Sequence, residues 1–201
     1  MEKSIGDRIS YIDDKSSCSI VILPKRVRWK EAVLFAWLLA YSFVGLYMIY
    51  LLFFGLHTID NTGIEGNPEE ILKNQKIYLT VFIAFWAYFE YKVVRGFLWL
   101  VKGKELIKIA GGELIIKQSI FNYGKANKYF IDNVKNFELV EHKSFSFGFD
   151  YENAFWRQGT DSLILSVNGK DIGFGKKLNT KDANLLLRLM KDRMKKLSKL
   201  S

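Results

Sequence analysis

The strongest constraint on this chain is a run of 25 consecutive residues without a charged side chain, Ala32–Leu56. About 20 apolar residues in a helix cross a hydrocarbon core of about 30 Å. A buried helix of a soluble protein rarely stays uncharged for so long, so we expect this run to span a membrane. It follows a polar N-terminal segment and lacks a small-residue cleavage site behind a short apolar stretch, which favours a retained span over a signal peptide.

A second apolar segment, residues 77–101, is interrupted by Glu90, Lys92 and Arg95. As a helix it would be about 37 Å long at about 1.5 Å per residue, which is enough to cross a bilayer. Lys92 and Arg95 are close enough to one end to extend towards headgroups, and Glu90 can pair with one of them. The alternative is a proton or ion relay at Glu90. We therefore expect a helical hairpin over residues 32–101, with spans at 32–56 and 77–101 and an external loop at 57–76.

The basic residues that flank the two spans predict their orientation. The first span is preceded by four basic residues, Lys25, Arg26, Arg28 and Lys30, and the second is followed by three, Lys102, Lys104 and Lys108. The loop contains only two, Lys73 and Lys76. Because loops rich in Lys and Arg stay in the cytoplasm, we expect both termini to be cytoplasmic. Trp29, Trp99 and Arg95 are the expected anchors at the membrane interface.

Small residues recur along one stripe of each predicted span. The stripes consist of Ala32, Ala36 and Ala40 in the first span and of Thr80, Ala84 and Ala87 in the second. In lipid, small side chains stabilise helix pairs because they let the two backbones approach closely. The pattern predicts an antiparallel hairpin in which the two stripes face each other.

Residues 102–201 change to short β-like runs, and they carry 19 basic and 11 acidic side chains. Gly111-Gly112 and Asn168-Gly169 are two-residue hairpin turn signals between such runs. The chain then has an apolar stripe with helical spacing over residues 181–197, with Thr180 as the expected N-cap. We expect an α+β, mainly β domain, in which short antiparallel strands form a partly open barrel or sandwich capped by a C-terminal amphipathic helix.

Residues 1–31 form a separate N-terminal cytoplasmic segment in this prediction. Arg8–Ile12 and Ser19–Leu23 flank a turn-like polar stretch, which suggests a β-hairpin. Since both ends of the chain are expected on one side of the membrane, this hairpin can dock on residues 102–201. A disordered tail is the alternative.

Several stretches resemble the bacterial membrane-flanked PH-like proteins, in which transmembrane helices adjoin a PH-like domain. They are Gly103–Ile109 (GKELIKI), Gly111–Lys117 (GGELIIK), Lys128–Asp132 (KYFID) and Val134–Phe137 (VKNF). The resemblance implies two transmembrane helices in the bacterial inner membrane, a cytoplasmic PH-like domain, and a role in interaction or assembly. Phosphoinositide-binding PH domains add an arginine to the basic cluster of their first hairpin. The corresponding hairpin here has only lysines, so we do not expect specific inositol-phosphate recognition.

The sequence has no recognisable catalytic signature. Nucleophile-elbow, phosphate-loop, His-Glu-x-x-His and dinucleotide patterns are absent. The single cysteine and two distant histidines, His57 and His142, argue against a zinc site. We therefore expect no catalytic, metal-binding or cofactor-binding residues, and no enzyme.

The candidate partner or lipid surface combines aromatic and basic residues. It consists of Phe145, Phe147, Trp156, Arg157, Lys104, Lys108 and Lys117. Alternation along residues 145–151 puts the aromatic rings on one strand face, which is either core or an exposed edge. The basic charge suits an anionic leaflet, and no base-reading motif indicates nucleic acid.

These observations lead to three hypotheses. The first is a non-enzymatic membrane protein that tethers its PH-like module to the cytoplasmic membrane face for association with a protein partner or with itself. The second is an anionic-lipid-binding module, and the third is an accessory subunit of a membrane enzyme complex.

Overall fold

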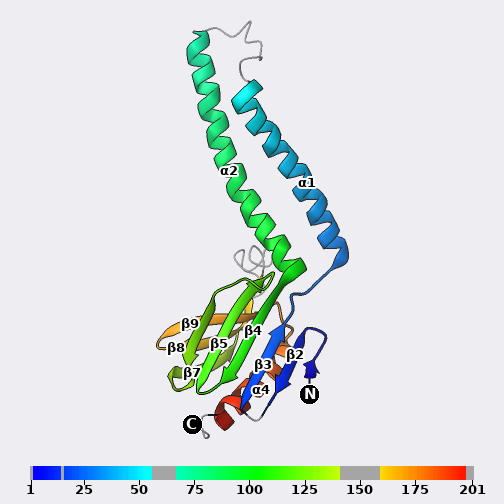
Figure 1. Ribbon diagram of the computed structural model, residues 1–201, viewed down its shortest axis with the longest axis vertical. Helices are drawn as coiled ribbons and strands as arrows, with labels where there is room; N and C mark the ends of the chain where they lie inside the picture. Colours follow the sequence, from blue (N-terminus) through cyan, green and yellow to red (C-terminus); the bar gives the residue numbers. More distant parts are fainter. Residues whose placement is uncertain (1, 15, 56–66, 141–158, 198–201) are drawn as a thin grey trace. The chain divides into compact units, whose positions relative to one another are not determined.

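The computed structural model describes residues 2–14, 16–55, 67–140 and 159–197. The chain divides into two compact units (Figure 1). One, which we call the helical unit, is Arg28–Phe97; the other, the β-rich unit, consists of Met1–Val27 and Leu98–Ser201.

The helical unit contains two helices that are long and apolar enough to cross a membrane. Helix α1 (Arg28–Tyr50) continues into a π-helical turn, η1 (Leu51–Gly55), and the second helix is α2 (Pro68–Lys102). Helix α2 starts earlier than its apolar segment because Asn67 caps it: the Asn67 Oδ1 atom accepts a hydrogen bond of 3.1 Å from the Glu69 N–H. Proline at the first helical position has no N–H to leave unpaired.

Aromatic rings, and not the predicted small-residue stripes, make contacts between α1 and α2. The Trp86 ring lies against Gly45, and its Nε1 donates a 3.0 Å hydrogen bond to the Tyr41 carbonyl oxygen. All six stripe residues are exposed: Ala32, Ala36, Ala40, Thr80, Ala84 and Ala87. The predicted packing therefore differs from the observed one. The physical reason is that a glycine opposite an indole ring gives a larger contact, with a hydrogen bond in addition, than two stripes of methyl groups.

The β-rich unit contains two antiparallel sheets and a C-terminal helix (Figure 1). The first sheet has the order β1-β2-β3-β4-β5-β6, with β1 Glu2–Ile5, β2 Ile9–Asp13, β3 Ser17–Ile22, β4 Gly103–Ala110, β5 Glu113–Ile120 and β6 Ala126–Phe130. A short 3-10 helix, η3 (Ile131–Asn133), leads to the second sheet, which consists of β7 Val134–Leu139, β8 Asp161–Val167 and β9 Lys170–Lys176. Among the described residues the sheets do not close into a barrel. The expected strand at 144–151 lies outside the described residues.

The N-terminal hairpin is present and belongs to the first sheet. Strand β3 pairs with β4 along its whole length, from Ser17 opposite Ala110 to Ile22 opposite Glu105. In addition, Arg193 of α4 (Thr180–Leu197) forms an ion pair with Asp13 of β2. The predicted boundaries at residues 31 and 102 therefore separate segments that share one sheet.

The core lies between the two sheets and α4. Its fully buried side chains include Ile20, Ile107, Leu165, Phe174, Leu186 and Met190. Helix α4 buries five of the six residues of the stripe predicted from its spacing, Ala183, Leu186, Met190, Met194 and Leu197, and leaves the sixth, Leu187, half-buried. Its cap differs from the prediction, because Asn179 Oδ1, and not the Thr180 hydroxyl, accepts a 2.7 Å hydrogen bond from the Asp182 N–H.

Candidate functional site

One face of the first sheet carries four lysines. Lys104 and Lys108 lie four residues apart on β4 and so point to the same side. Strand register places Lys117 opposite Leu106 and Lys128 opposite Ile115. Residues directly opposite each other in an antiparallel pair point to the same side, and so do residues two apart in one strand. The three lysines predicted from the sequence as part of the candidate surface therefore share this side with Lys128.

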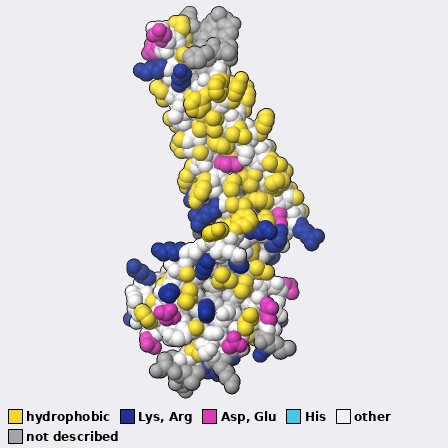
Figure 2. Space-filling model, viewed as in Figure 1, with side chains coloured by type: hydrophobic (Ala, Val, Ile, Leu, Met, Phe, Trp, Pro, Cys, Tyr) yellow, Lys and Arg dark blue, Asp and Glu magenta, His cyan; other side chains and the backbone are white. Residues whose placement is uncertain are grey.

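We call this side the lysine face and define it by Lys104, Lys108, Lys117 and Lys128 together with Val21, Leu106 and Ile115. The opposite side of β4 carries buried residues, including Ile107 and Ile109. The residues of the lysine face are half-buried or exposed. Figure 2 shows Lys and Arg side chains distributed over the β-rich unit with apolar groups between them. A surface of this kind can bind an acidic partner, and it contains no nucleophile–base pair.

A buried carboxylate, Glu105, lies on the opposite side of the same strand. Its side chain accepts hydrogen bonds from the backbone N–H groups of Gly175, at 2.6 Å, and Lys176, at 3.2 Å. The residue is only 1% exposed, and this burial raises the pKa of the Glu105 carboxyl despite the two donors. The carboxylate thus joins the first sheet to the end of β9.

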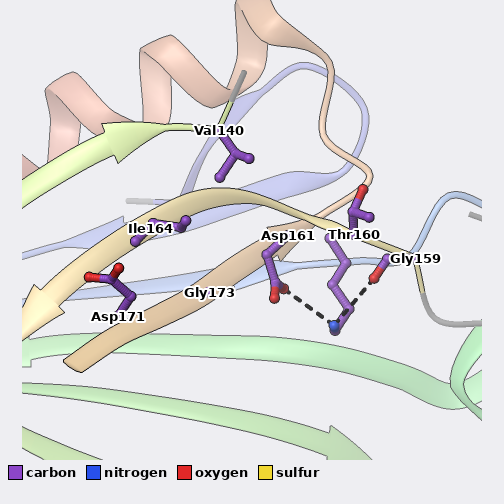
Figure 3. A pocket seen from close by; sticks show the side chains of 8 residues that line it. Val140, Gly159, Thr160, Asp161, Ile164, Asp171 and Gly173 are labelled. Carbon is purple, nitrogen blue, oxygen red and sulfur yellow. Dashed lines mark hydrogen bonds and ion pairs between the residues drawn. The ribbon is translucent and has the colours of Figure 1, made fainter. Parts of the chain in front are cut away.

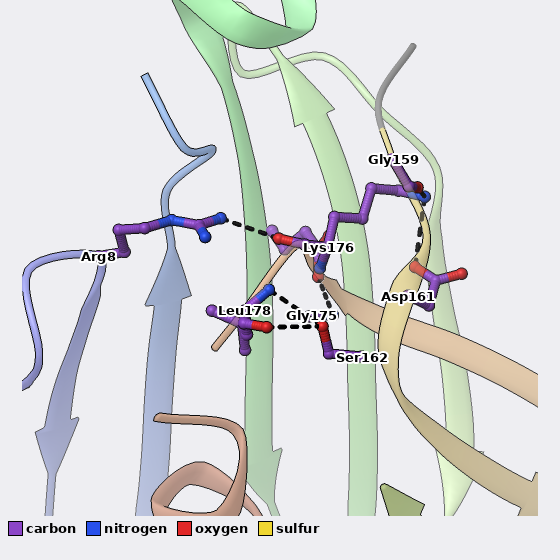
Figure 4. A network of polar contacts seen from close by, with 8 residues as sticks. Arg8, Gly159, Asp161, Ser162, Gly175, Lys176 and Leu178 are labelled. Carbon is purple, nitrogen blue, oxygen red and sulfur yellow. Dashed lines mark hydrogen bonds and ion pairs between the residues drawn. The ribbon is translucent and has the colours of Figure 1, made fainter. Parts of the chain in front are cut away.

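Arg8 also forms hydrogen bonds at the end of β9 (Figure 4). Its guanidinium donates to the carbonyl oxygens of Leu23, at 2.8 Å, Lys176, at 2.8 Å, and Lys177, at 2.6 Å. Ser162 adds a further link, since its Oγ accepts a hydrogen bond from the Leu178 N–H at 3.0 Å. Burial lowers the pKa of Arg8. This network links the β1–β2 turn, β4, β8 and the end of β9, so its main effect is on the relative position of the two sheets.

A pocket of about 390 Å³ adjoins this network (Figure 3). Its lining includes Thr160, Asp161, Asp171, Lys176, Val140 and Ile164. The Lys176 ammonium pairs with Asp161 Oδ1 at 3.3 Å and donates to the Gly159 carbonyl oxygen at 3.4 Å. The Ser166 hydroxyl donates to Asp171. Asp161, Asp171 and Lys176 therefore each have a partner within the protein itself.

Other polar chemistry in the described part of the chain is sparse. No group of three or more His, Cys, Asp or Glu side chains there could hold a metal ion. Cys18 is fully buried, and burial raises the pKa of its thiol, which disfavours the reactive thiolate.

The predicted interface anchors have different environments. Trp29 is 65% exposed, and Arg95 is exposed as well. Trp99, in contrast, is only 2% exposed and packs against Gly103, where a Cβ atom would lie 2.7 Å from the indole ring. The Trp99 ring therefore packs within the protein, whereas Trp29 and Arg95 are free to extend towards headgroups. Four further candidates lie outside the described residues: Phe145, Phe147, Trp156 and Arg157.

Sequence reasoning missed two features. It gave no role to Arg8 or Glu105, because their partners are distant in the chain. It also missed Phe121 and Tyr123, two exposed aromatic residues in the β5–β6 turn, although a Phe-Asn-Tyr-Gly turn between lysines is visible in the sequence.

The chain was compared with protein-family models, with curated proteins and with solved structures, and none of them matches it.

Proposed function

We propose that this chain is a non-enzymatic integral membrane protein whose two helices anchor the β-rich unit at one membrane face. There the lysine face binds an acidic surface of a protein partner. The observation that carries this proposal is the alignment of four lysines on one sheet face, in a unit whose strand β4 directly follows an apolar helix.

The chemistry of the lysine face favours a protein partner. Half-exposed apolar side chains, such as Leu106 and Ile115, lie between the cationic groups. Interfaces combine a desolvated apolar centre with complementary charge around it. A second copy of the same face would bring lysines opposite lysines, and such like-charge contacts are unfavourable. An acidic partner is therefore a better fit than self-association.

We also propose that the β-rich unit is PH-like and lies at the cytoplasmic face of a bacterial inner membrane. The order of short antiparallel strands followed by one covering helix supports the PH-like assignment. The basic flanks of both spans support the cytoplasmic orientation.

The test compares two triple variants of the full-length protein. Lys104→Glu, Lys108→Glu and Lys117→Glu reverse the charge of the lysine face. The control changes Lys135, Lys170 and Lys191, three exposed lysines on other elements, to glutamate. Each protein is purified from native membranes in mild detergent, and its associated proteins and lipids are quantified by mass spectrometry.

We expect one stoichiometric acidic protein with the unchanged chain and with the control, and its loss from the lysine-face variant. Equal loss from both variants, or no stoichiometric protein at all, contradicts the proposal.

Anionic-lipid binding is the second candidate, favoured by the net charge of +8 that follows from 19 basic and 11 acidic residues in 102–201. A basic residue near an anionic leaflet contributes about 1 kcal/mol. Enrichment of an anionic lipid that depends on the lysine face, without a protein partner, would support this function instead.

A further inference from the structure

The β5–β6 turn has an unusual residue at its tip. Ile120 and Tyr123 exchange two backbone hydrogen bonds of 2.9 Å, which close a two-residue turn. The two central residues have positive φ, 50° at Phe121 and 69° at Asn122. Turns of this kind favour Asn and Gly, and a bulky aromatic residue in the left-handed region is strained. Phe121 thus occupies a position that backbone preference alone would not give to phenylalanine.

The fold does not use the aromatic rings of this turn. Phe121 is 53% exposed and Tyr123 is 84% exposed. Their apolar surface therefore remains in contact with solvent unless something outside the described residues covers it. Aromatic side chains contribute much of the contact energy when they meet a partner or a membrane interface.

Positive charge surrounds the turn. Residues 117–125 contain Lys117 and Lys125 and no acidic residue. The Lys117 ammonium donates a 3.0 Å hydrogen bond to the Asn122 carbonyl oxygen, which holds a cation directly at the turn. Exposed aromatic rings among lysines match the headgroup layer of an anionic leaflet, where rings settle and basic groups are attracted.

Strand register shows at which end of the sheet the turn lies. Gly103, the first residue of β4, pairs with Ile120, the last residue of β5. Gly103 also follows Lys102, the last residue of α2. Neighbouring strands are about 4.8 Å apart, so the turn lies at the end of the sheet where the chain leaves the apolar helix.

We propose that Phe121 and Tyr123, which we call the aromatic turn, insert into the headgroup layer of the membrane that α1 and α2 cross. This contact fixes the β-rich unit with one end of its first sheet on the lipid. The lysine face then remains available to a partner. The inference depends on the helices crossing a membrane and not on the identity of any partner.

The experiment uses the full-length protein in liposomes of phosphatidylcholine and phosphatidylglycerol. The only cysteine of the chain is removed by Cys18→Ala, and a spin label is attached at Phe121→Cys or, in a second variant, Tyr123→Cys. The matched control is Phe130→Cys, an aromatic residue that is 64% exposed and pairs with Glu113 at the opposite end of the sheet. Collisions of the label with oxygen, which dissolves in lipid, and with a water-soluble nickel chelate are measured.

We expect the oxygen-to-nickel collision ratio at positions 121 and 123 to be several-fold higher than at 130, and to decrease when phosphatidylglycerol is omitted. Equal ratios at all three positions would overturn the proposal. A label at 121 that is shielded from both reagents would also overturn it, because a protein contact would then cover the turn. Circular dichroism confirms that each labelled variant keeps its fold.

Discussion

Arg8 and Glu105 show how single charged residues connect distant segments of this protein. Arg8 reaches the Lys177 carbonyl oxygen across 169 residues of sequence. Glu105 accepts two backbone N–H groups at the end of the same strand that supplies one of the Arg8 acceptors. Backbone groups at a strand end lack ladder partners, so these two side chains satisfy them.

The raised pKa of Glu105 predicts a pH-dependent stability. In the folded protein this pKa lies above its ordinary value of 4.5, so the folded state binds more protons than the unfolded state between the two values. The contribution of Glu105 to the free energy of unfolding is therefore complete below the unfolded pKa, and is lost as pH rises through the folded pKa. We expect the melting temperature of the β-rich unit to decrease over this range, and less so in Glu105→Gln. Near-ultraviolet circular dichroism measures the melting temperature of each protein as a function of pH. The exposed Glu138→Gln should leave the pH dependence unchanged, and a flat profile for the unchanged protein would refute the prediction.

Arg8→Lys should weaken the junction between the sheets. An ammonium cannot reproduce the planar fork that donates to three carbonyl oxygens, so we expect a loss of about 1–3 kcal/mol in stability. Hydrogen exchange of peptides covering residues 170–178 should become faster. Arg188→Lys, on the exposed side of α4, provides the control. Unchanged exchange in Arg8→Lys would show that the network is not stabilising.

At the scale of elements, Gly45 leaves the space that the Trp86 ring occupies between α1 and α2. A Cβ atom at Gly45 would lie 1.9 Å from the Trp86 ring. Near this contact, the Ser42 hydroxyl donates a 2.5 Å hydrogen bond to Glu90 Oε1. Glu90 therefore has a partner on the other helix, which differs from the expected pairing with Lys92 or Arg95. A polar link of this kind stabilises a helix pair in lipid.

Gly45→Leu should separate the two helices. Overpacking of this kind costs about 1–3 kcal/mol, and the Trp86–Tyr41 hydrogen bond would be lost with it. Thermal unfolding in detergent should shift to lower temperature. Ala36→Leu places a leucine side chain on the exposed side of α1 and should have little effect. A larger loss of stability in Ala36→Leu than in Gly45→Leu would instead indicate that the alanine stripes form the contact between the helices.

At the scale of the whole molecule, strand pairing restricts the topology in a membrane. Strands β3 and β4 are adjacent in one sheet, yet both helices lie between them in the sequence. The two strands must therefore lie on the same side of any membrane, and an even number of crossings achieves this. One crossing by α1 alone would leave β3 and β4 on opposite sides.

Together with the proposed cytoplasmic orientation of both termini, this topology predicts which parts of the chain a protease reaches in spheroplasts. Tags at the N-terminus and C-terminus should both be protected, whereas a cleavage site inserted next to Asn67 should be cut. Permeabilised cells, in which all three sites should be cleaved, provide the control. Protection of only one terminus would be incompatible with the pairing of β3 and β4.

The sequence by itself determined the features that depend on neighbouring residues. The length of the uncharged run predicted α1, glycine-containing turns predicted the β4–β5 and β8–β9 hairpins, and helical spacing predicted the buried stripe of α4. The sequence also grouped Lys104, Lys108 and Lys117 as the basic residues of one hairpin, and the strand register places their side chains on one face.

Only the tertiary structure decided how distant segments meet. It placed the N-terminal hairpin beside β4, the Arg8 guanidinium at the end of β9, and the Trp86 ring on Gly45. No local pattern encodes these contacts, since each depends on which surfaces are left uncovered after the helices and hairpins form. Long-range pairing is selected by the packing and hydrogen bonding of the whole unit, and a periodicity within one segment carries no information about the partner of that segment.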